Sequence, residues 1–255
     1  MISHGVQFSI AQHAQWAPGL ETDSLWDEWA AERTLISPTN NTPPGVQDMP
    51  AMLRRRARFL GRMALEVAYR CLGERQDIPT IFCSRHGEVD HSVELIQELN
   101  TEGGISPIGF SSAVHNATAG LFSIARKDRS NHIAIAAGAS TVEHAVIEAC
   151  SLLEDGAQAV LLVNYEQALP PVFERFQDCL EQAYAWAWLI VPAREDSVTL
   201  QWKKGASISA DTPCDVSGVS PPGLDILHFH LAKSASLERS ANGLQWTWSR
   251  NSDAV

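Results

Sequence analysis

Residues 132–163 read HIAIAAGASTVEHAVIEACSLLEDGAQAVLLV. The runs at 132–137 and 159–163 are continuously apolar, which is typical of strands buried on both faces. Between them, residues 141–154 carry apolar side chains at helical spacing, and Gly156 is a natural stop. A strand, a helix and a second strand in this order favour a sheet covered by helices. The stretch therefore predicts the α/β class.

The flanking sequence extends the same pattern in both directions. A third buried strand is predicted at 79–84 (PTIFCS), and strands with alternating polarity are predicted at 184–191 and 197–202. The predicted helices are 23–33, 50–72, 89–99, 111–125 and 172–179, followed by a helix and an edge strand within 224–248. The Pro-rich segment 37–50 and the Ser/Asp/Pro/Gly-rich segment 205–223 are predicted loops.

The 255 residues are expected to form a single domain with one substantial core. We divide it into a Trp- and Pro-rich N-terminal segment (1–50), an α/β core (51–168), and C-terminal strands with a tail (169–255).

Acidic residues outnumber basic ones by 30 to 19, which gives a formal net charge of −11. This balance argues against a nucleic-acid-binding protein, because such proteins normally carry a basic face that neutralises phosphates. One basic patch stands out against the acidic background. It consists of five arginines between positions 54 and 62, which we call the Arg patch: Arg54, Arg55, Arg56, Arg58 and Arg62.

The cysteines and the apolar segments indicate the compartment. Five cysteines, an odd number without a CxxC pair, predict buried reduced thiols and no metal site. The N-terminus lacks the basic and long apolar regions of a signal peptide, and the apolar windows are too short for a membrane span, which needs about 20 residues. A cytoplasmic protein is therefore expected.

A family resemblance emerges from the order and spacing of several motifs. They are RFLGRMALE (58–66), IFCSRHG (81–87), ISP (105–107), NATAG (116–120), NHIAIAA (131–137), and the helix ending in LEDG before VLLV. Over residues 54–167 these motifs resemble the N-terminal half of β-ketoacyl synthases, the condensing enzymes of the thiolase fold. The resemblance implies a layered α/β/α fold around a mixed sheet, followed here by a short C-terminal extension outside the family.

The resemblance makes Ala139 a decisive position. Condensing enzymes carry a nucleophilic Cys at the turn between strand and helix, and this position aligns with Ala139 in AAGAST. A helix N-terminus stabilises a thiolate, whereas an alanine cannot form an acyl-thioester. Residues after 167 are also too few for the half that supplies the family's two catalytic His residues, and HFHLAK around His228 and His230 lacks their pattern. The resemblance thus implies a protein that does not catalyse condensation.

A narrower set of motifs resembles the truncated ketosynthase-like proteins of bacterial aryl polyene biosynthesis. These motifs are WAPGL (16–20), MLRRR (52–56), RMALE (62–66), SRHG (84–87) and SAVHNA (112–117). Such proteins are taken to be chain-length-factor-like partners of a catalytic ketosynthase. The resemblance implies a heterodimer that needs no cofactor of its own, since the substrate is carried on the phosphopantetheine of an acyl carrier protein.

The candidate site residues fall into two groups. Contacts with the partner or the acyl tunnel are expected at His115, Asn116, Ala139, Ser140 and His144. The Arg patch is expected to dock the acidic carrier protein or the partner, with a solvated helix face as the alternative. Two other functions stay open: a thioester hydrolase or acyltransferase that uses Ser140 with His144 or Cys83 with His86, and a carrier-docking scaffold without a ketosynthase.

Overall fold

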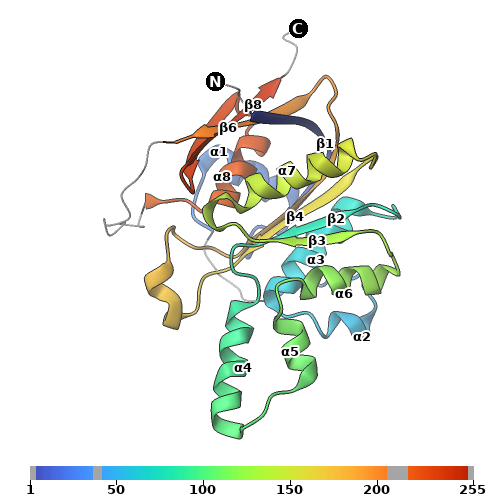
Figure 1. Ribbon diagram of the computed structural model, residues 1–255, viewed down its shortest axis with the longest axis vertical. Helices are drawn as coiled ribbons and strands as arrows, with labels where there is room; N and C mark the ends of the chain where they lie inside the picture. The colour runs from blue at the N-terminus through green and yellow to red at the C-terminus, as the bar shows by residue number, and fades with distance from the viewer. Residues whose placement is uncertain (1–3, 37–41, 206–217, 252–255) are drawn as a thin grey trace.

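The computed structural model describes residues 4–36, 42–205 and 218–251. In this part of the chain, eight strands form one mixed sheet in the order β3-β2-β4-β5-β1-β6-β8-β7 (Figure 1). Strand β2 pairs in parallel with β3 and β4, and the other pairs are antiparallel. The strands are β1 (His4–Trp16), β2 (Thr80–Cys83), β3 (His132–Ile135), β4 (Val160–Glu166), β5 (Tyr184–Pro192), β6 (Ser197–Lys204), β7 (Ser236–Ala241) and β8 (Leu244–Asn251).

Helices cover the sheet on both faces. The α-helices are α1 (Asp23–Glu32), α2 (Ala51–Arg54), α3 (Phe59–Leu72), α4 (Val89–Glu102), α5 (Pro107–Ala113), α6 (Ala117–Arg126), α7 (Thr141–Glu154) and α8 (Pro222–Leu231). Side chains of α1, α7 and α8 enter the core on one face, whereas α3 and α6 fill the core on the other. Helices α4 and α5 project together from the rest of the molecule (Figure 1). The α/β/α fold predicted from the sequence is confirmed.

The central strands show why both faces need cover. Along β5, Trp186 and Trp188 point to the α7 face, while Ala185 and Ala187 point to the α3 face. Successive side chains of a strand alternate between faces, so a continuously apolar strand demands two cores. Four late tryptophans are at most 1% exposed and belong to the core on the α7 face: Trp186, Trp188, Trp246 and Trp248. Residues after 168 therefore cover the sheet within the chain.

The single helix predicted at 50–72 is wrong, because the structure breaks it into α2 and α3. Arg58 is extended, with φ −79° and ψ −177°, and α3 starts after it. The first turn of α3 gains a tertiary cap, since the Gly61 N–H donates to the Glu88 carboxyl at 3.1 Å. The break also avoids stacking Arg54 and Arg58 at helical i,i+4 spacing, where like charges repel.

The helix predicted at 111–125 is also divided, into α5 and α6. Val114 is extended at the break, and the following His115 ring donates from Nε2 to the Ser84 carbonyl at 2.9 Å. The ring packs on Gly87, where an added Cβ would lie 2.9 Å from His115 Cδ2 and where φ is +59°. This contact with the end of β2 outweighs the local helical pattern.

Three further segments differ from the sequence prediction. Strand β1 was not predicted, although its 13 residues pair with both β5 and β6. The helix predicted at 172–179 is a short 3-10 segment, Pro171–Phe176, because it lacks the length and apolar face of a packed helix. The edge strand predicted within 224–248 is a hairpin of β7 and β8, and β7 forms the edge. No helix among the described residues is long and apolar enough to cross a membrane.

Candidate functional site

The turn between β3 and α7 holds the three predicted residues Ala139, Ser140 and His144. Gly138 opens the turn with φ +54°, a left-handed backbone that favours glycine. Residues Gly138–Ser140 then form one 3-10 turn that leads into α7. The Thr141 hydroxyl donates to the Gly138 carbonyl at 2.7 Å and accepts from the Ala137 N–H at 2.9 Å. The sequence thus builds a tight strand-to-helix turn with Ala139 half-buried at its centre.

Two residues of the C-terminal hairpin bind this turn, and sequence analysis missed both. The side-chain amide of Asn242 donates to the Ala137 carbonyl at 2.8 Å and contacts the Ser140 hydroxyl at 2.7 Å. The guanidinium of Arg239 donates to the Ala139 carbonyl at 3.0 Å. The one available signal was Asn242-Gly243, a typical turn pair of a β-hairpin.

Arg239 also forms an ion pair with Glu143, which lies on the first turn of α7. Glu143 is fully buried. Burial raises the pKa of its carboxyl group, and the Arg239 guanidinium opposes that rise. A buried carboxylate needs such a partner, because its desolvation is otherwise strongly unfavourable.

Ser140 and His144 do not form a nucleophile–base pair. The Ser140 hydroxyl is fully buried and donates to the Ala137 carbonyl at 3.2 Å. The His144 Nδ1 bonds the Ser140 backbone carbonyl at 2.8 Å, and the ring packs edge-on against Trp246. The geometry that a serine nucleophile requires is a hydroxyl bonded to the base. The structure does bring the two residues together, but the contact joins the His144 ring to the Ser140 backbone at the start of α7.

Cys83 and His86 are likewise not a pair. Cys83 is fully buried in the core, burial raises the pKa of its thiol, and its closest polar partner is the Asn164 amide at 3.7 Å. His86 instead faces Glu181, with 3.8 Å between Nε2 and Oε1, and burial lowers the pKa of its ring. A buried thiol with a raised pKa is a poor nucleophile.

A buried polar cluster, also missed from sequence, lies at the ends of β2 and β4. Glu166 accepts from the Arg85 N–H at 2.8 Å and from the Ser84 hydroxyl at 3.3 Å. Burial raises the pKa of Glu166 to about 8, against the lowering effect of these donors and of the Arg85 charge. The bonds tie the loop after β2 to the adjacent strand.

His115 and Asn116, which were predicted together as contact residues, have different surroundings in the structure. His115 is held between Ser84 and Gly87, as described above. Asn116 is exposed and lines a surface cavity, and among the described residues its side chain has no hydrogen-bond partner. Of the pair, only Asn116 faces a space that another molecule can enter.

The five arginines of the Arg patch also fall into two groups, those bonded within the chain and those without such a bond. Arg54 donates to the Val46 carbonyl at 3.2 Å, Arg58 pairs with Glu94 at 2.6 Å, and Arg62 donates to the Ala57 carbonyl at 3.2 Å. Arg55 and Arg56 are exposed, and their side chains have no hydrogen bond or ion pair within the described part of the chain. Two of the five guanidinium groups therefore have no partner within the described chain and are free for an external one.

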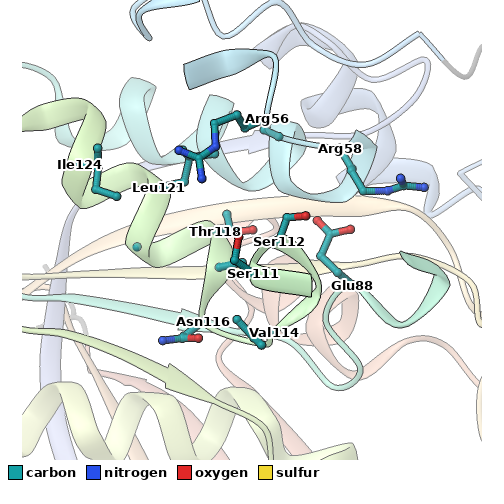
Figure 2. A pocket seen from close by; sticks show the side chains of 13 residues that line it. Arg56, Arg58, Glu88, Ser111, Ser112, Val114, Asn116, Thr118, Leu121 and Ile124 are labelled. Atoms are coloured by element: carbon teal, nitrogen blue, oxygen red, sulfur yellow. The ribbon is translucent and has the colours of Figure 1, made fainter. Parts of the chain in front are cut away.

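Arg56 and Asn116 both line one cavity of about 290 Å³, and Figure 2 shows them at opposite ends of it. The segment between α2 and α3 forms one wall, and α5 and α6 form the other. In Figure 2 the Arg56 side chain extends toward Leu121, whereas Arg58 extends in the opposite direction. The remaining lining residues are Ala57, Glu88, Ser111, Ser112, Val114, Ala117, Thr118, Gly120 and Ile124.

Glu88 separates this cavity from a neighbouring one of about 490 Å³, since Glu88 and Arg58 line both. The side chain is buried, and burial raises its pKa to about 7 while the Arg58 charge and the Gly61 N–H lower it. Glu88 therefore titrates near neutral pH.

The other predictions on the sequence concern cysteines and metals. Four cysteines are free and buried, as predicted; Cys214 lies outside the described residues. Residues 4–36, 42–205 and 218–251 contain no group of three or more His, Cys, Asp or Glu residues that could hold a metal ion.

The layered fold, with a tight turn from an inner strand into a buried helix, defines the class: a thiolase-like protein of the condensing-enzyme type. The family model of the β-ketoacyl synthase N-terminal domain matches residues 26–249, and the chain belongs to this family. The comparison with curated proteins gives no match. The family match includes the C-terminal strands, so the predicted extension outside the family is wrong for those strands.

Three solved structures illustrate the similarity. The first is described as the ketosynthase ApeO in complex with its chain length factor ApeC from Xenorhabdus doucetiae; the matched chain is 25% identical with a TM-score of 0.79, over 96% of this chain and 100% of that one. The second, the ishigamide ketosynthase/chain length factor, is 11% identical with a TM-score of 0.74, over 98% and 100%. The third, a type II polyketide acyl-carrier protein in complex with its ketosynthase, is 12% identical with a TM-score of 0.69, over 96% and 99%. The first two chains are matched over their whole length.

Proposed function

We propose that this chain is a non-catalytic ketosynthase-like subunit that pairs with a catalytic β-ketoacyl synthase and acts as its chain-length factor. The observation that carries the proposal is Ala139 at the turn into α7, where the resemblance assigns the family's cysteine. The methyl group of alanine cannot attack a thioester, and the adjacent Ser140 hydroxyl is buried and already bonded. The proposed setting is aryl polyene or polyketide-type synthesis in the cytoplasm.

The contacts around Ala139 support a structural role for this turn. Arg239 and Asn242 occupy the carbonyls of Ala139 and Ala137. A catalytic turn presents free donors and an accessible side chain to its substrate. Here the turn carries alanine in place of a reactive side chain, and its Ala137 and Ala139 carbonyls and Ser140 hydroxyl accept from the chain's own hairpin.

The proposed partner surface lies on α4, α5 and α6. Six large apolar side chains between positions 96 and 124 are exposed: Ile96, Leu99, Ile108, Phe110, Val114 and Ile124. Apolar side chains gathered on one part of a surface commonly mark a protein interface. Strand β3, the adjacent end of the sheet, has no neighbour on its outer side among the described strands. A partner that covers this surface would remove both the apolar area and the open strand edge.

The proposed control of chain length rests on the limited volume of the partner's acyl tunnel. Side chains of this subunit would form part of the wall that closes the partner's acyl tunnel, with Asn116 and its neighbours as the candidates. Close-packed walls accept extra methylene groups only at a substantial energetic cost, so the chain stops growing when the space is filled. The 25% identity to a chain from a ketosynthase–chain length factor complex supports this assignment.

Carrier-protein docking is a second proposed role, and it rests on Arg55 and Arg56. Both are exposed and free of partners within the described chain. An acidic carrier protein complements these charges. The third similar structure contains a carrier protein bound to its ketosynthase.

The experiment is co-expression of this chain with a catalytic β-ketoacyl synthase from the same organism. Size-exclusion chromatography with light scattering should show a complex of both proteins, and product analysis should show condensation only when the ketosynthase is present. A ketosynthase that is monodisperse, fully active and unchanged in product length without this chain would overturn the proposal. Thioester hydrolysis by the isolated chain, abolished by Ser140→Ala or Cys83→Ala, would favour the hydrolase alternative.

A further inference from the structure

Arg56 is a charged group with no internal role. It is exposed, and no side chain or carbonyl of the described residues pairs with it. Its neighbours Arg54, Arg58 and Arg62 are each bound within the chain. The Arg56 guanidinium keeps all its hydrogen-bond donors available at the cavity.

The wall that Arg56 faces is mainly apolar. Val114, Leu121 and Ile124 line it, with Ile124 58% exposed and Val114 38% exposed. Ala117 and Gly120 lie on the same wall and leave space between the larger side chains. A guanidinium opposite an apolar wall suits a molecule with a charged head and an apolar body.

The hydroxyl and amide groups of the cavity complete the pattern. The Ser111 and Ser112 hydroxyls donate to the carbonyls of Ile108 and Gly109, so their protons are committed. The Asn116 amide has no partner among the described residues and can donate to a ligand oxygen. Arg56 thus offers an unpaired cationic donor to an anion, and in Figure 2 the Asn116 amide lies at the opposite end of the cavity.

Glu88 is the one carboxyl group in the lining. Its Oε1 accepts from the Gly61 N–H, and Figure 2 shows it on the Arg58 side of the cavity, away from Arg56. The pKa of about 7 means that the group is partly protonated near neutral pH. Its repulsion of an anion held at Arg56 is therefore weakened by both position and protonation.

We propose that this cavity binds a small amphipathic anion, a carboxylate or a phosphate monoester, with its charge on Arg56 and its apolar body against Leu121 and Ile124. The volume of about 290 Å³ lies at the lower end of the range for small-molecule sites, about 300–1,000 Å³. An eight-carbon chain with one anionic head is a probe of suitable size. Val114 and Ile124 also belong to the proposed partner surface, so the site is tested on the isolated chain, where no ketosynthase covers it.

Isothermal titration of the full chain, below micellar concentrations, tests the proposal with four probes: octanoate, octyl phosphate, 1-octanol and inorganic phosphate. Saturable binding of octanoate or octyl phosphate is expected, and the tighter of the two identifies the head group. Arg56→Gln should weaken that binding about tenfold or more, since a charge-assisted hydrogen bond is lost. Ile124→Asp should weaken it as well, whereas Arg129→Gln, at an exposed arginine that does not line the cavity, should leave it unchanged.

Several results would overturn the site. They are the absence of saturable binding by both anionic amphiphiles, equal affinity for octanol, equal affinity for inorganic phosphate, or unchanged binding in Arg56→Gln. An equal loss in Arg55→Gln, whose arginine does not line the cavity, would assign the effect to the general charge of the patch. A failed pairing with the ketosynthase leaves all these expectations in place, so the two proposals fail separately.

Discussion

The guanidinium of Arg239 pairs with the buried carboxyl group of Glu143, 96 positions earlier in the chain. The same guanidinium donates to the Ala139 carbonyl at 3.0 Å. The β7–β8 hairpin is thereby fastened to the first turn of α7, at the position that the resemblance assigns to the family's nucleophile. The hairpin is thus part of the structure of the turn.

Arg239→Leu should destabilise the protein by about 3–5 kcal/mol, because it leaves the Glu143 carboxylate buried without a partner. Urea unfolding followed by tryptophan fluorescence measures the loss. The double variant Arg239→Leu/Glu143→Leu should recover most of it, since two apolar groups then replace the pair. If the double variant is as unstable as the single one, the ion pair is not the cause.

Asn242→Gly should destabilise by about 1–2 kcal/mol, because it removes the side-chain bonds to Ala137 and Ser140 but keeps a residue that tolerates positive φ. Asn242→Ala should cost about 1 kcal/mol more, since the backbone at this position has φ +52°. The same unfolding measurement ranks the three proteins. Equal stability of Asn242→Gly and the unchanged chain would mean that water replaces the two bonds without loss.

The raised pKa of Glu88 predicts that the unfolding free energy of the protein falls with rising pH. Its pKa is raised from 4.5 to about 7, so the folded state binds the proton more tightly than the unfolded state does. The stabilisation is complete below pH 4.5 and is lost as the pH rises through 7; a shift of this size corresponds to at most about 3 kcal/mol. Glu88→Gln should reduce the decline in unfolding free energy between about pH 5 and pH 8, and the exposed Glu98→Gln should not. If the unfolding free energies of both variants decline equally with pH, Glu88 is not the cause of the decline. Glu166, whose pKa is also raised, adds the same decline to both variants.

The double charge reversal Arg55→Glu/Arg56→Glu should abolish measurable binding of an acyl carrier protein, because both free charges of the Arg patch change sign. Surface plasmon resonance at low and physiological salt measures the effect, and the weakening should grow at low salt. Arg129→Glu changes a single exposed charge elsewhere and serves as the control. Carrier binding that survives the double reversal would remove the Arg patch from the docking surface.

Ile108→Asp with Phe110→Asp should prevent the complex with the ketosynthase, since each places a charge in the proposed apolar interface. Both side chains are more than half exposed, at 68% and 58%, so the isolated chain should keep its stability. Val172→Asp, at a residue 64% exposed outside this surface, is the matched control. Light scattering of the mixed proteins separates the outcomes, and a complex formed equally by all variants would place the interface elsewhere.

The sequence predicted the inner strands because their signal is local. Strands β2 and β4 contain the continuous apolar runs that predicted them, and α7 has a clear helical period with a glycine after it. Burial on both faces imposes these patterns, so the fold class could be derived from them. The family resemblance added the layered arrangement.

The misses have long-range causes. The break before α3 depends on Glu88, and the break before α6 depends on the contact of His115 with Ser84. Neither contact leaves a local signal in the helical pattern. Strand β1 is the exception, because Val6, Phe8 and Ile10 alternate with polar residues and so carry a local strand signal that the prediction did not include. Within the site, the grouping of Ala139, Ser140 and His144 was predictable from spacing, whereas the arrival of Arg239 and Asn242 was not.

The central position of β1 has a consequence for biosynthesis. Residues 4–16 leave the ribosome well before residues 184–204, with which they pair. The segment must wait without its hydrogen-bond partners while some 170 residues are added, and closing so long a loop is entropically slow. A nascent chain that stalls before β5 therefore holds an unpaired N-terminal strand that can be captured by a chaperone or by another nascent chain. The middle of the sheet can therefore close only after β5 and β6 have been made, long after β1.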